Sequence, residues 1–235
     1  AATASATTAA SATVPGSGSG SGSDPAGGSA AASPSVDPLD PPGSSPVPEG
    51  ATGSAERPFN ADSPFNVPVA AGAALDPDTA AMVARISRAG LGHANLVEFG
   101  IPIYAAAADT PRRMVRCTIT EWGVCPLEQG SPRQIPDDAV PDAGRDGAMV
   151  VVDRAAGTAD EYFQAAPTDT GWTTGWGEIT SLTGSGWGGG TTGAGASRLG
   201  GVIRVAEIRA GAIPHALVLE SDTACAAAFR PPALK

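Results

Sequence analysis

The stretch AMVVVDRAAGTADEYFQA, residues 148–165, decides the fold class of this chain. Its apolar run over residues 148–153 and the alternating stretch over residues 159–165 are typical of two β-strands. Between them lies RAAG, in which Gly157 can adopt the positive φ that a tight turn needs. The stretch therefore predicts a β-hairpin.

Shorter strand signals lie on both sides of this hairpin. In RMVRCTI, residues 113–119, the side chains of Val115, Cys117 and Ile119 point one way and the intervening ones the other, as in a half-buried strand. HALVLE, residues 215–220, is predicted as a further strand. Short strands with turn signals between them favour a mainly β fold, an antiparallel β-sandwich of the jelly-roll or concanavalin-like type.

Two short helices are predicted in this mainly β chain. The clearer one lies in LDPDTAAMVARISRAG, where Asp76 can cap the start and Gly90 ends the helix. Its apolar face is formed by Met82, Val83 and Ile86. VAEIRA, residues 205–210, is predicted as a second helix that is closed by Gly211.

Residues 1–54 differ from the rest of the chain in composition. They consist mainly of Ala, Ser, Thr, Gly and Pro, and no aromatic or basic residue precedes Arg57. Such a stretch buries too little apolar surface to offset the entropy of ordering, so we interpret it as a stalk or linker. Its Ser, Thr and Pro content and its lack of an Asn-x-Ser/Thr sequon predict O-glycosylation. Residues 55–235 are predicted to form a single β-rich domain.

The charge of the chain excludes two classes of partner. The net charge is −10 and the only lysine is Lys235, so the chain lacks the basic surface that nucleic acids and anionic lipids require. No apolar run is long enough to cross a bilayer, and no membrane insertion is expected.

The opening AATASATTAASATVPG is typical of a mature exported protein. We therefore expect a secreted or cell-surface protein.

The three cysteines fit an exported protein. Cys117 and Cys125 bracket TITEWGV, a spacing suited to a disulfide that closes a short loop. The alternative is three buried thiols in a cytosolic protein. With the pair joined, Cys225 is left over, which predicts a disulfide partner for it on another chain or on a further segment.

Three segments resemble one protein family: GRDGAMVVVDRAAGTADEYFQA, GWTTGWGEITSL and GASRLGGVIRVAEIRAGAIPHALVLE. The family comprises exported bacterial proteins, actinobacterial ones among them, without an established activity. The resemblance covers residues 56–235, and AGAIPHAL is its most specific element. It implies that the chain is shortened at Lys235, because the relatives continue past this point. Relatives often have a histidine where this sequence has Ala148 and Met149, which counts against a catalytic histidine there.

Few side chains are available for catalysis. His93 and His215 lie in separate segments without HxH or HExxH spacing, so neither a metal site nor a cofactor is expected. GASRL is not a GxSxG elbow, which argues against a serine-based triad. His215 is either a structural histidine or a general acid or base.

Glu161 and Glu178 are the acid–base candidates, because paired carboxylates cleave glycosidic bonds; surface carboxylates are the alternative. With Phe163 facing the core, Glu161 is expected at the rim of that core.

Trp172 and Trp176, in GWTTGWGEI, carry a hypothesis of sugar binding. Their even spacing places both on one face of a single strand, and Glu178 continues that face. An indole suits a hydrophobic core as well as the stacked face of a pyranose. We assign Trp172, Trp176 and Gln164 as ligand-binding residues and expect Trp172, next to the turn PTDTG, to lie nearer to solvent. The glycine-rich residues 184–197 form either a mobile loop over a site or a loop packed by its neighbours.

Two functions from different classes follow from these observations. The first is an exported or cell-surface domain that binds or processes an extracellular polysaccharide through the face of Trp172 and Trp176. The second is a structural protomer of a glycosylated extracellular fibre or surface coat, a homo-oligomer without catalytic activity. The sequence leaves open whether the protein is an enzyme.

Overall fold

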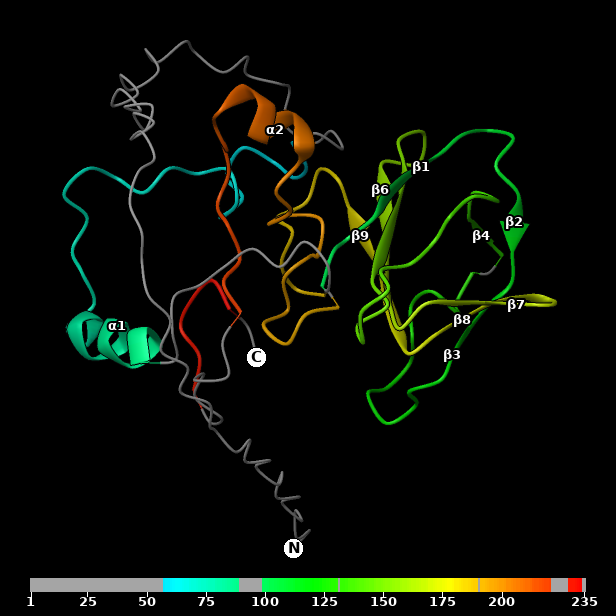
Figure 1. Ribbon diagram of the computed structural model, residues 1–235, viewed down its shortest axis with the longest axis horizontal. Coiled ribbons are helices and arrows are strands. Elements are labelled where there is room, and N and C mark those ends of the chain that lie inside the picture. Colours follow the sequence, from blue (N-terminus) through cyan, green and yellow to red (C-terminus); the bar gives the residue numbers. More distant parts are fainter. Residues whose placement is uncertain (1–56, 89–98, 131, 190, 221–227, 234–235) are drawn as a thin grey trace, which may run out of the picture. The chain divides into compact units, whose positions relative to one another are not determined.

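The computed structural model describes residues 57–88, 99–130, 132–189, 191–220 and 228–233. The predicted stalk, His93 and Cys225 lie outside these residues. Within the described ranges the chain forms two helices and nine strands (Figure 1). In chain order they are α1 Thr79–Arg88, β1 Ile103–Ala106, β2 Arg112–Arg113, β3 Val115–Cys117, β4 Arg133–Gln134, β5 Met149–Asp153, β6 Thr158–Phe163, β7 Ala166–Thr168, β8 Gly171–Thr174, β9 Trp176–Ser181 and α2 Val205–Ala210.

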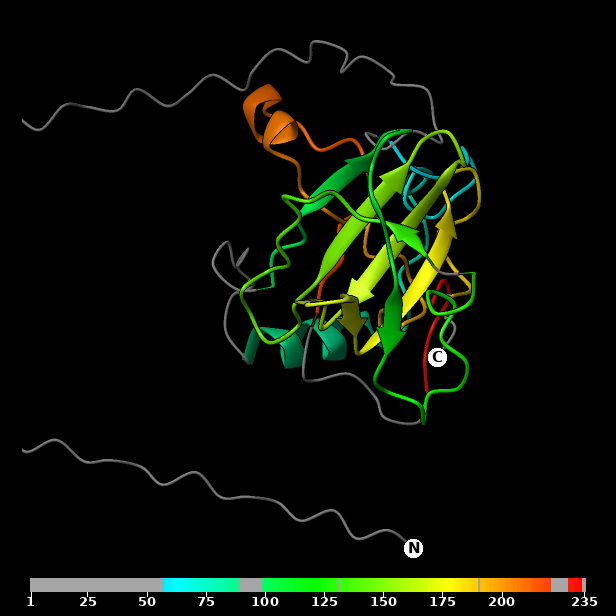
Figure 2. The ribbon, with the colours of Figure 1, turned by 90° about the vertical axis from the view of Figure 1, so that its right-hand side faces the viewer.

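The strands β1, β5, β6 and β9 form one sheet in that order (Figure 2). The predicted hairpin is confirmed, because β5 pairs antiparallel with β6 and places Val151 opposite Asp160. Gly157 lies in the turn with a φ of 68°, which glycine adopts without steric cost. On the outer sides of the hairpin, β9 pairs antiparallel with β6 and β1 pairs parallel with β5. The hairpin is therefore the centre of this central sheet.

Both faces of the central sheet are covered. Met149 and Val151 of β5 point to one face, and Val150 and Val152 point to the other. All of these side chains are buried. A strand that is covered on both faces needs apolar residues at every position, which explains the uninterrupted run MVVV.

Two hydrophobic cores lie on the two faces of the central sheet. One packs the sheet against β3, β8 and the disulfide loop (residues 117–125), and we call it the disulfide-side core. It comprises Val115, Cys117, Cys125, Leu127, Ile135, Ala139, Met149, Val151, Tyr162, Ala165 and Trp172. The other packs the sheet against residues 59–65 and the glycine-rich loop (residues 184–189 and 191–197), and we call it the loop-side core. It comprises Phe59, Phe65, Val150, Val152, Ala159, Leu182, Ala196 and Leu199.

The pairing of the strands corrects part of the predicted fold. β3, β8 and β7 form a second sheet, and β2 pairs with β4. The mainly β class is confirmed, whereas the sandwich arrangement stays a prediction. Pairing is not antiparallel throughout, because β1–β5 and β3–β8 are parallel. The segments between these partners, residues 107–148 and 118–170, are long enough for the crossover that parallel strands require, and side-chain alternation carries no information on strand direction.

Both predicted helices are confirmed. Asp76 does not cap α1 as expected: it lies three residues before Thr79, and its carboxylate accepts a hydrogen bond from the backbone N–H of Asp78 at 2.8 Å in the preceding turn. Gly90, the predicted end of this helix, lies outside the described residues. α2 ends at Gly211 with a φ of 69°. The apolar face of α1 does not enter a core, since none of the residues described in this helix is buried. Neither helix of the described ranges has the length and apolar character needed to cross a membrane.

The strand predicted over residues 215–220 is wrong. In the described part of the chain this segment pairs with no strand, although the backbone N–H of Ala216 donates to the Phe65 carbonyl at 2.9 Å. A strand needs a partner edge for its backbone groups, and an apolar sequence alone does not supply one. As a result Leu217 and Leu219 are exposed.

The predicted disulfide between Cys117 and Cys125 is confirmed. Their Cα atoms lie 6.3 Å apart, and both residues belong to the disulfide-side core. The disulfide loop that they close carries Trp122. Such a bond is consistent with an extracellular protein, because disulfides persist in oxidising compartments.

Replacing Cys117 and Cys125 together with serine is expected to lower the free energy of unfolding by about 2 to 3 kcal/mol, because the unfolded chain then loses the constraint of a short closed loop. Urea denaturation followed by circular dichroism measures this loss. The reduced wild-type protein is the matched control and is expected to show the same loss. An unfolding midpoint equal to that of the oxidised wild type would contradict the stabilising role of the bond.

Candidate functional site

Three aromatic rings meet where β6 ends and β9 begins. Phe163 lies opposite Trp176 in the strand register, so these two side chains share one face of the sheet. Trp122, from the disulfide loop, stacks against Phe163 with ring centroids 6.0 Å apart and meets Trp176 edge-on at 6.2 Å. Trp122 is 57% exposed. We call these three residues the aromatic platform.

The two tryptophans of GWTTGWGEI do not share a strand. Trp172 belongs to β8 and Trp176 to β9, and Gly175 separates the strands at the point where the chain passes from one sheet to the other. The expectation that Trp172 lies nearer to solvent is wrong: it is 8% exposed and packs in the disulfide-side core, while Trp176 is half-buried. The reason is that β8 is the middle strand of its sheet, where even a residue close to a turn is covered.

Sequence reasoning did not select Trp122 as a candidate site residue. It lies in EWG, in the middle of the segment that the two cysteines close. A large aromatic ring in a short disulfide-closed loop has little core to enter, and that is the signal that could have identified it. Phe163 was missed because its partner across the sheet depends on the register between β6 and β9.

Arg198, directly after the glycine-rich loop, contacts one ring of the platform. Its guanidinium carbon is 5.5 Å from the centre of the Phe163 ring. The same group forms an ion pair with Asp146 at 3.4 Å, and its Nε donates to the Thr191 hydroxyl at 2.9 Å. The Arg198 side chain is only 8% exposed. Arg198 therefore supports Phe163 and ties the glycine-rich loop to it, and its charge is neutralised inside the protein.

Glu161 is fully buried under the glycine-rich loop and not at the rim of a core as expected. Its carboxylate accepts hydrogen bonds from the Thr180 hydroxyl at 2.9 Å and the Thr191 hydroxyl at 3.2 Å. The Ser197 hydroxyl and the backbone N–H of Arg198, at 2.9 Å, also donate to it. Both oxygens are thus satisfied by protein groups. Glu161 anchors the loop to the sheet, and the loop is packed by its neighbours.

Burial raises the pKa of Glu161 above its ordinary value of 4.5. The hydrogen bonds from Ser197, Arg198, Thr180 and Thr191 stabilise the ionised carboxylate and oppose this rise without cancelling it. The three hydroxyl groups can rotate, so a protonated Glu161 can still donate to one of them. The anchor can therefore exist in either protonation state.

The raised pKa of Glu161 predicts a stability that depends on pH. Because the folded protein binds this proton more readily than the unfolded chain, protonation favours the folded state, and the contribution is lost as the pH rises through the raised pKa. We expect the free energy of unfolding of the wild type, relative to Glu161→Gln, to increase as the pH is lowered from neutrality toward 4.5. Urea denaturation at several pH values measures it.

The comparison with Glu161→Gln removes the contributions of other groups. Burial also raises the pKa of Asp160, against the hydrogen bond from Arg133, but both residues are present in both proteins and their effects cancel. A difference between the two proteins that stays constant with pH would show that the pKa of Glu161 is not raised.

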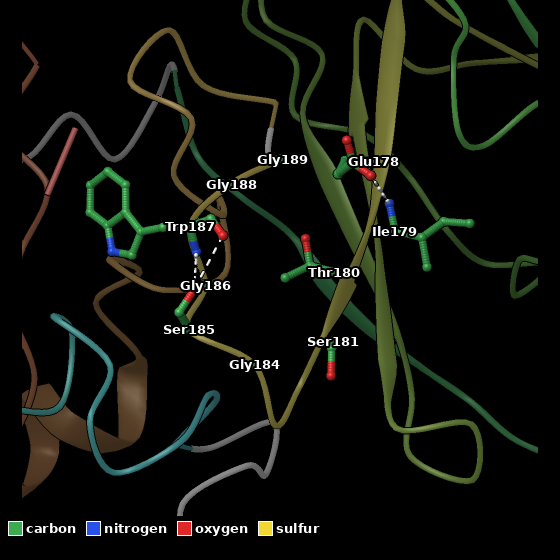
Figure 3. A pocket seen from close by; sticks show the side chains of 10 residues that line it. All are labelled: Glu178, Ile179, Thr180, Ser181, Gly184, Ser185, Gly186, Trp187, Gly188 and Gly189. Carbon is green, nitrogen blue, oxygen red and sulfur yellow. Dashed lines mark hydrogen bonds between the residues drawn. The ribbon is translucent and has the colours of Figure 1, made fainter. Parts of the chain in front are cut away.

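Glu178 lies beside Glu161 but in a different environment. The two residues are opposite one another in the register of β6 and β9, so their side chains leave the same face of the sheet. Glu178 is half-buried and lines a cleft of about 290 Å³ between β9 and the glycine-rich loop. Figure 3 shows Glu178 on the β9 side, the backbone of residues 184–189 on the other, and the Trp187 indole pointing away from Glu178. The sheet thus brings both predicted carboxylates together and leaves one of them accessible.

No family model, curated protein or solved structure matches the chain. The resemblance to exported bacterial proteins therefore stays a prediction, and the function has to be inferred from the site itself.

The remaining predicted site residues lie in two places. Gln164 is exposed at the end of β6, next to Phe163, and has a positive φ of 56°. His215 lies by α2: its Nε2 is 3.0 Å from a carboxylate oxygen of Glu207, and its Nδ1 is 2.8 Å from the Ala216 carbonyl. Gln164 thus borders the platform, whereas the contacts of His215 tie it to α2. Among the described residues no three His, Cys, Asp or Glu side chains gather to hold a metal ion.

Proposed function

We propose that this protein is an exported or cell-surface domain that binds an extracellular polysaccharide through the aromatic platform. The observation that carries the proposal is the exposed Trp122 ring, held against Phe163 and Trp176 at the end of a rigid sheet. Aromatic rings combine a large apolar face with low conformational entropy, which suits the apolar face of a sugar. The disulfide reduces the freedom of the loop that presents Trp122, so less entropy is lost on binding.

Binding fits the site better than hydrolysis does. A glycosidase needs two carboxyl groups that both reach the scissile bond. Glu161 is fully buried and its oxygens accept hydrogen bonds from protein groups, whereas Glu178 is open to the cleft. The geometry supplies an accessible carboxylate beside a stacking surface, which is sufficient for recognition of a sugar.

Replacing Trp122 with alanine is expected to weaken polysaccharide binding about 10- to 100-fold, because a central aromatic residue often contributes about 2 kcal/mol or more to an interface. The effect on the free energy of unfolding should stay below about 1 kcal/mol, since the ring is largely exposed. Affinity electrophoresis in gels that contain soluble neutral polysaccharides measures binding, and urea denaturation measures stability.

Val124→Ala is the matched control for this experiment. Val124 is an exposed apolar residue of the same disulfide loop, outside the platform. Its replacement should leave binding unchanged. Equal retardation of the wild type and Trp122→Ala, or no retardation of the wild type by any polysaccharide, would rule the proposal out.

A second candidate function is a structural protomer of a fibre or coat. The observation that favours it is a set of apolar side chains that stay exposed in and after α2: Val205, Ile208, Leu217 and Leu219. Exposed apolar side chains close together in one chain segment are typical of a surface that another protein covers. Light scattering of the full chain tests this candidate, and a protein that stays monomeric at high concentration excludes it.

A further inference from the structure

The aromatic platform and the cleft are linked by β9, which carries Trp176 of the platform and, two residues further on, Glu178 of the cleft. Trp176 and Glu178 alternate with Gly177 along β9, so their side chains leave the same face of the strand, about 7 Å apart along it. The cleft that Glu178 lines has a volume of about 290 Å³, close to the lower limit of ~300 Å³ for small-molecule sites. A sugar stacked on the platform therefore places its neighbour in the chain, or its own substituents, within reach of Glu178.

Glu178 has no cationic partner among the described residues. Within the described residues no arginine or lysine forms an ion pair with it, and its hydrogen bond is to the backbone N–H of Ile179 at 3.1 Å. The neighbouring Thr180 hydroxyl donates to Glu161 and cannot serve Glu178. An ionised carboxylate only accepts hydrogen bonds. Glu178 is therefore free to accept a hydrogen bond from a ligand, and a cationic donor binds it most strongly.

Arg198 does not offset the preference of Glu178 for a cationic donor. Arg198 contacts the Phe163 ring, but Asp146 neutralises its charge and little of its side chain is exposed. The chain as a whole carries a net charge of −10, which adds to a negative potential over the cleft. Ligands that carry carboxylate or sulfate groups are disfavoured at this position.

We infer that the site selects polysaccharides that contain amino sugars with free amines, through an ion pair between the protonated amine and Glu178. This inference rests on the proposed function, because it assumes that the ligand stacks on the aromatic platform. It adds a specificity-determining residue and a chemical class of ligand. Neutral glycans bind more weakly and acidic glycans most weakly of the three.

The test uses three β- or α-linked hexamers with the full chain: oligomers of glucosamine, of N-acetylglucosamine and of galacturonic acid. The first two share one backbone and differ in the amine alone. Isothermal titration calorimetry in slightly acidic buffer at constant ionic strength is expected to show about tenfold tighter binding of the glucosamine hexamer than of its acetylated form. Glu178→Gln should remove this preference while the acetylated hexamer binds as before.

Glu220→Gln is the control for non-specific attraction between an acidic protein and a cationic ligand. Glu220 is exposed and its replacement removes the same charge from a residue outside the platform and the cleft. The inference requires that Glu220→Gln keeps the preference for the amine. Equal loss in the two variants, or equal affinity of the wild type for both hexamers, overturns the inference and leaves polysaccharide binding intact. The proposed function is overturned as well if no hexamer binds, or if Trp122→Ala binds every hexamer as the wild type does.

Discussion

Replacing Glu161 with alanine is expected to lower the free energy of unfolding by about 3 kcal/mol, because it leaves buried donors without an acceptor. The backbone N–H of Arg198 cannot turn away, and it loses its carboxylate at 2.9 Å. The hydroxyls of Ser197, Thr180 and Thr191 can rotate, but they lie around the position that the side chain vacates. A buried donor without a partner costs roughly 1 to 3 kcal/mol, and the void adds to that cost.

Glu178→Ala is the matched control for this prediction. Glu178 is the register partner of Glu161 and is the same residue type, yet it lines an open cleft and water can replace its contacts. Its removal should change the free energy of unfolding by no more than about 0.5 kcal/mol. Urea denaturation followed by circular dichroism compares the two variants. Losses of equal size would mean that the buried hydrogen bonds of Glu161 do not hold the glycine-rich loop to the sheet.

The local elements of the fold could be predicted from the sequence. The hairpin of β5 and β6 follows from two apolar stretches separated by Gly157, and the end of α2 follows from Gly211. These signals act between residues that are close along the chain. The parallel pairing of β1 with β5, and the lack of a strand over residues 215–220, depend on which distant edges meet, and local alternation does not encode that.

The candidate site shows the same division between local and distant signals. The disulfide could be predicted from its spacing, whereas the adjacency of the candidates Glu161 and Glu178 depends on the register of β6 and β9. The position of the glycine-rich loop over Glu161 could not be predicted, because such a loop has few side chains whose pattern indicates where it packs. The contact of Trp122 with Phe163 joins residues 41 positions apart in the numbering and has no local signature.

Trp172→Ala is expected to lower the free energy of unfolding by about 3 to 5 kcal/mol, the range for truncating a buried tryptophan. Trp172 lies opposite Val115 in the parallel pair of β3 and β8, and both residues belong to the disulfide-side core. Because this core joins the second sheet to the central sheet, a cavity there removes contacts from both. Trp122→Ala provides the comparison, since it deletes the same indole from an exposed position.

The two variants together separate the two uses of tryptophan in this chain. Trp172→Ala should unfold at a much lower urea concentration than the wild type. Under conditions in which this variant remains folded, it should bind polysaccharide as the wild type does, because the Trp172 ring is not part of the platform. Trp122→Ala should show the reverse: near-normal unfolding and impaired binding. If folded Trp172→Ala fails to bind while Trp122→Ala binds normally, the sugar is recognised through the second sheet and the aromatic platform has another purpose.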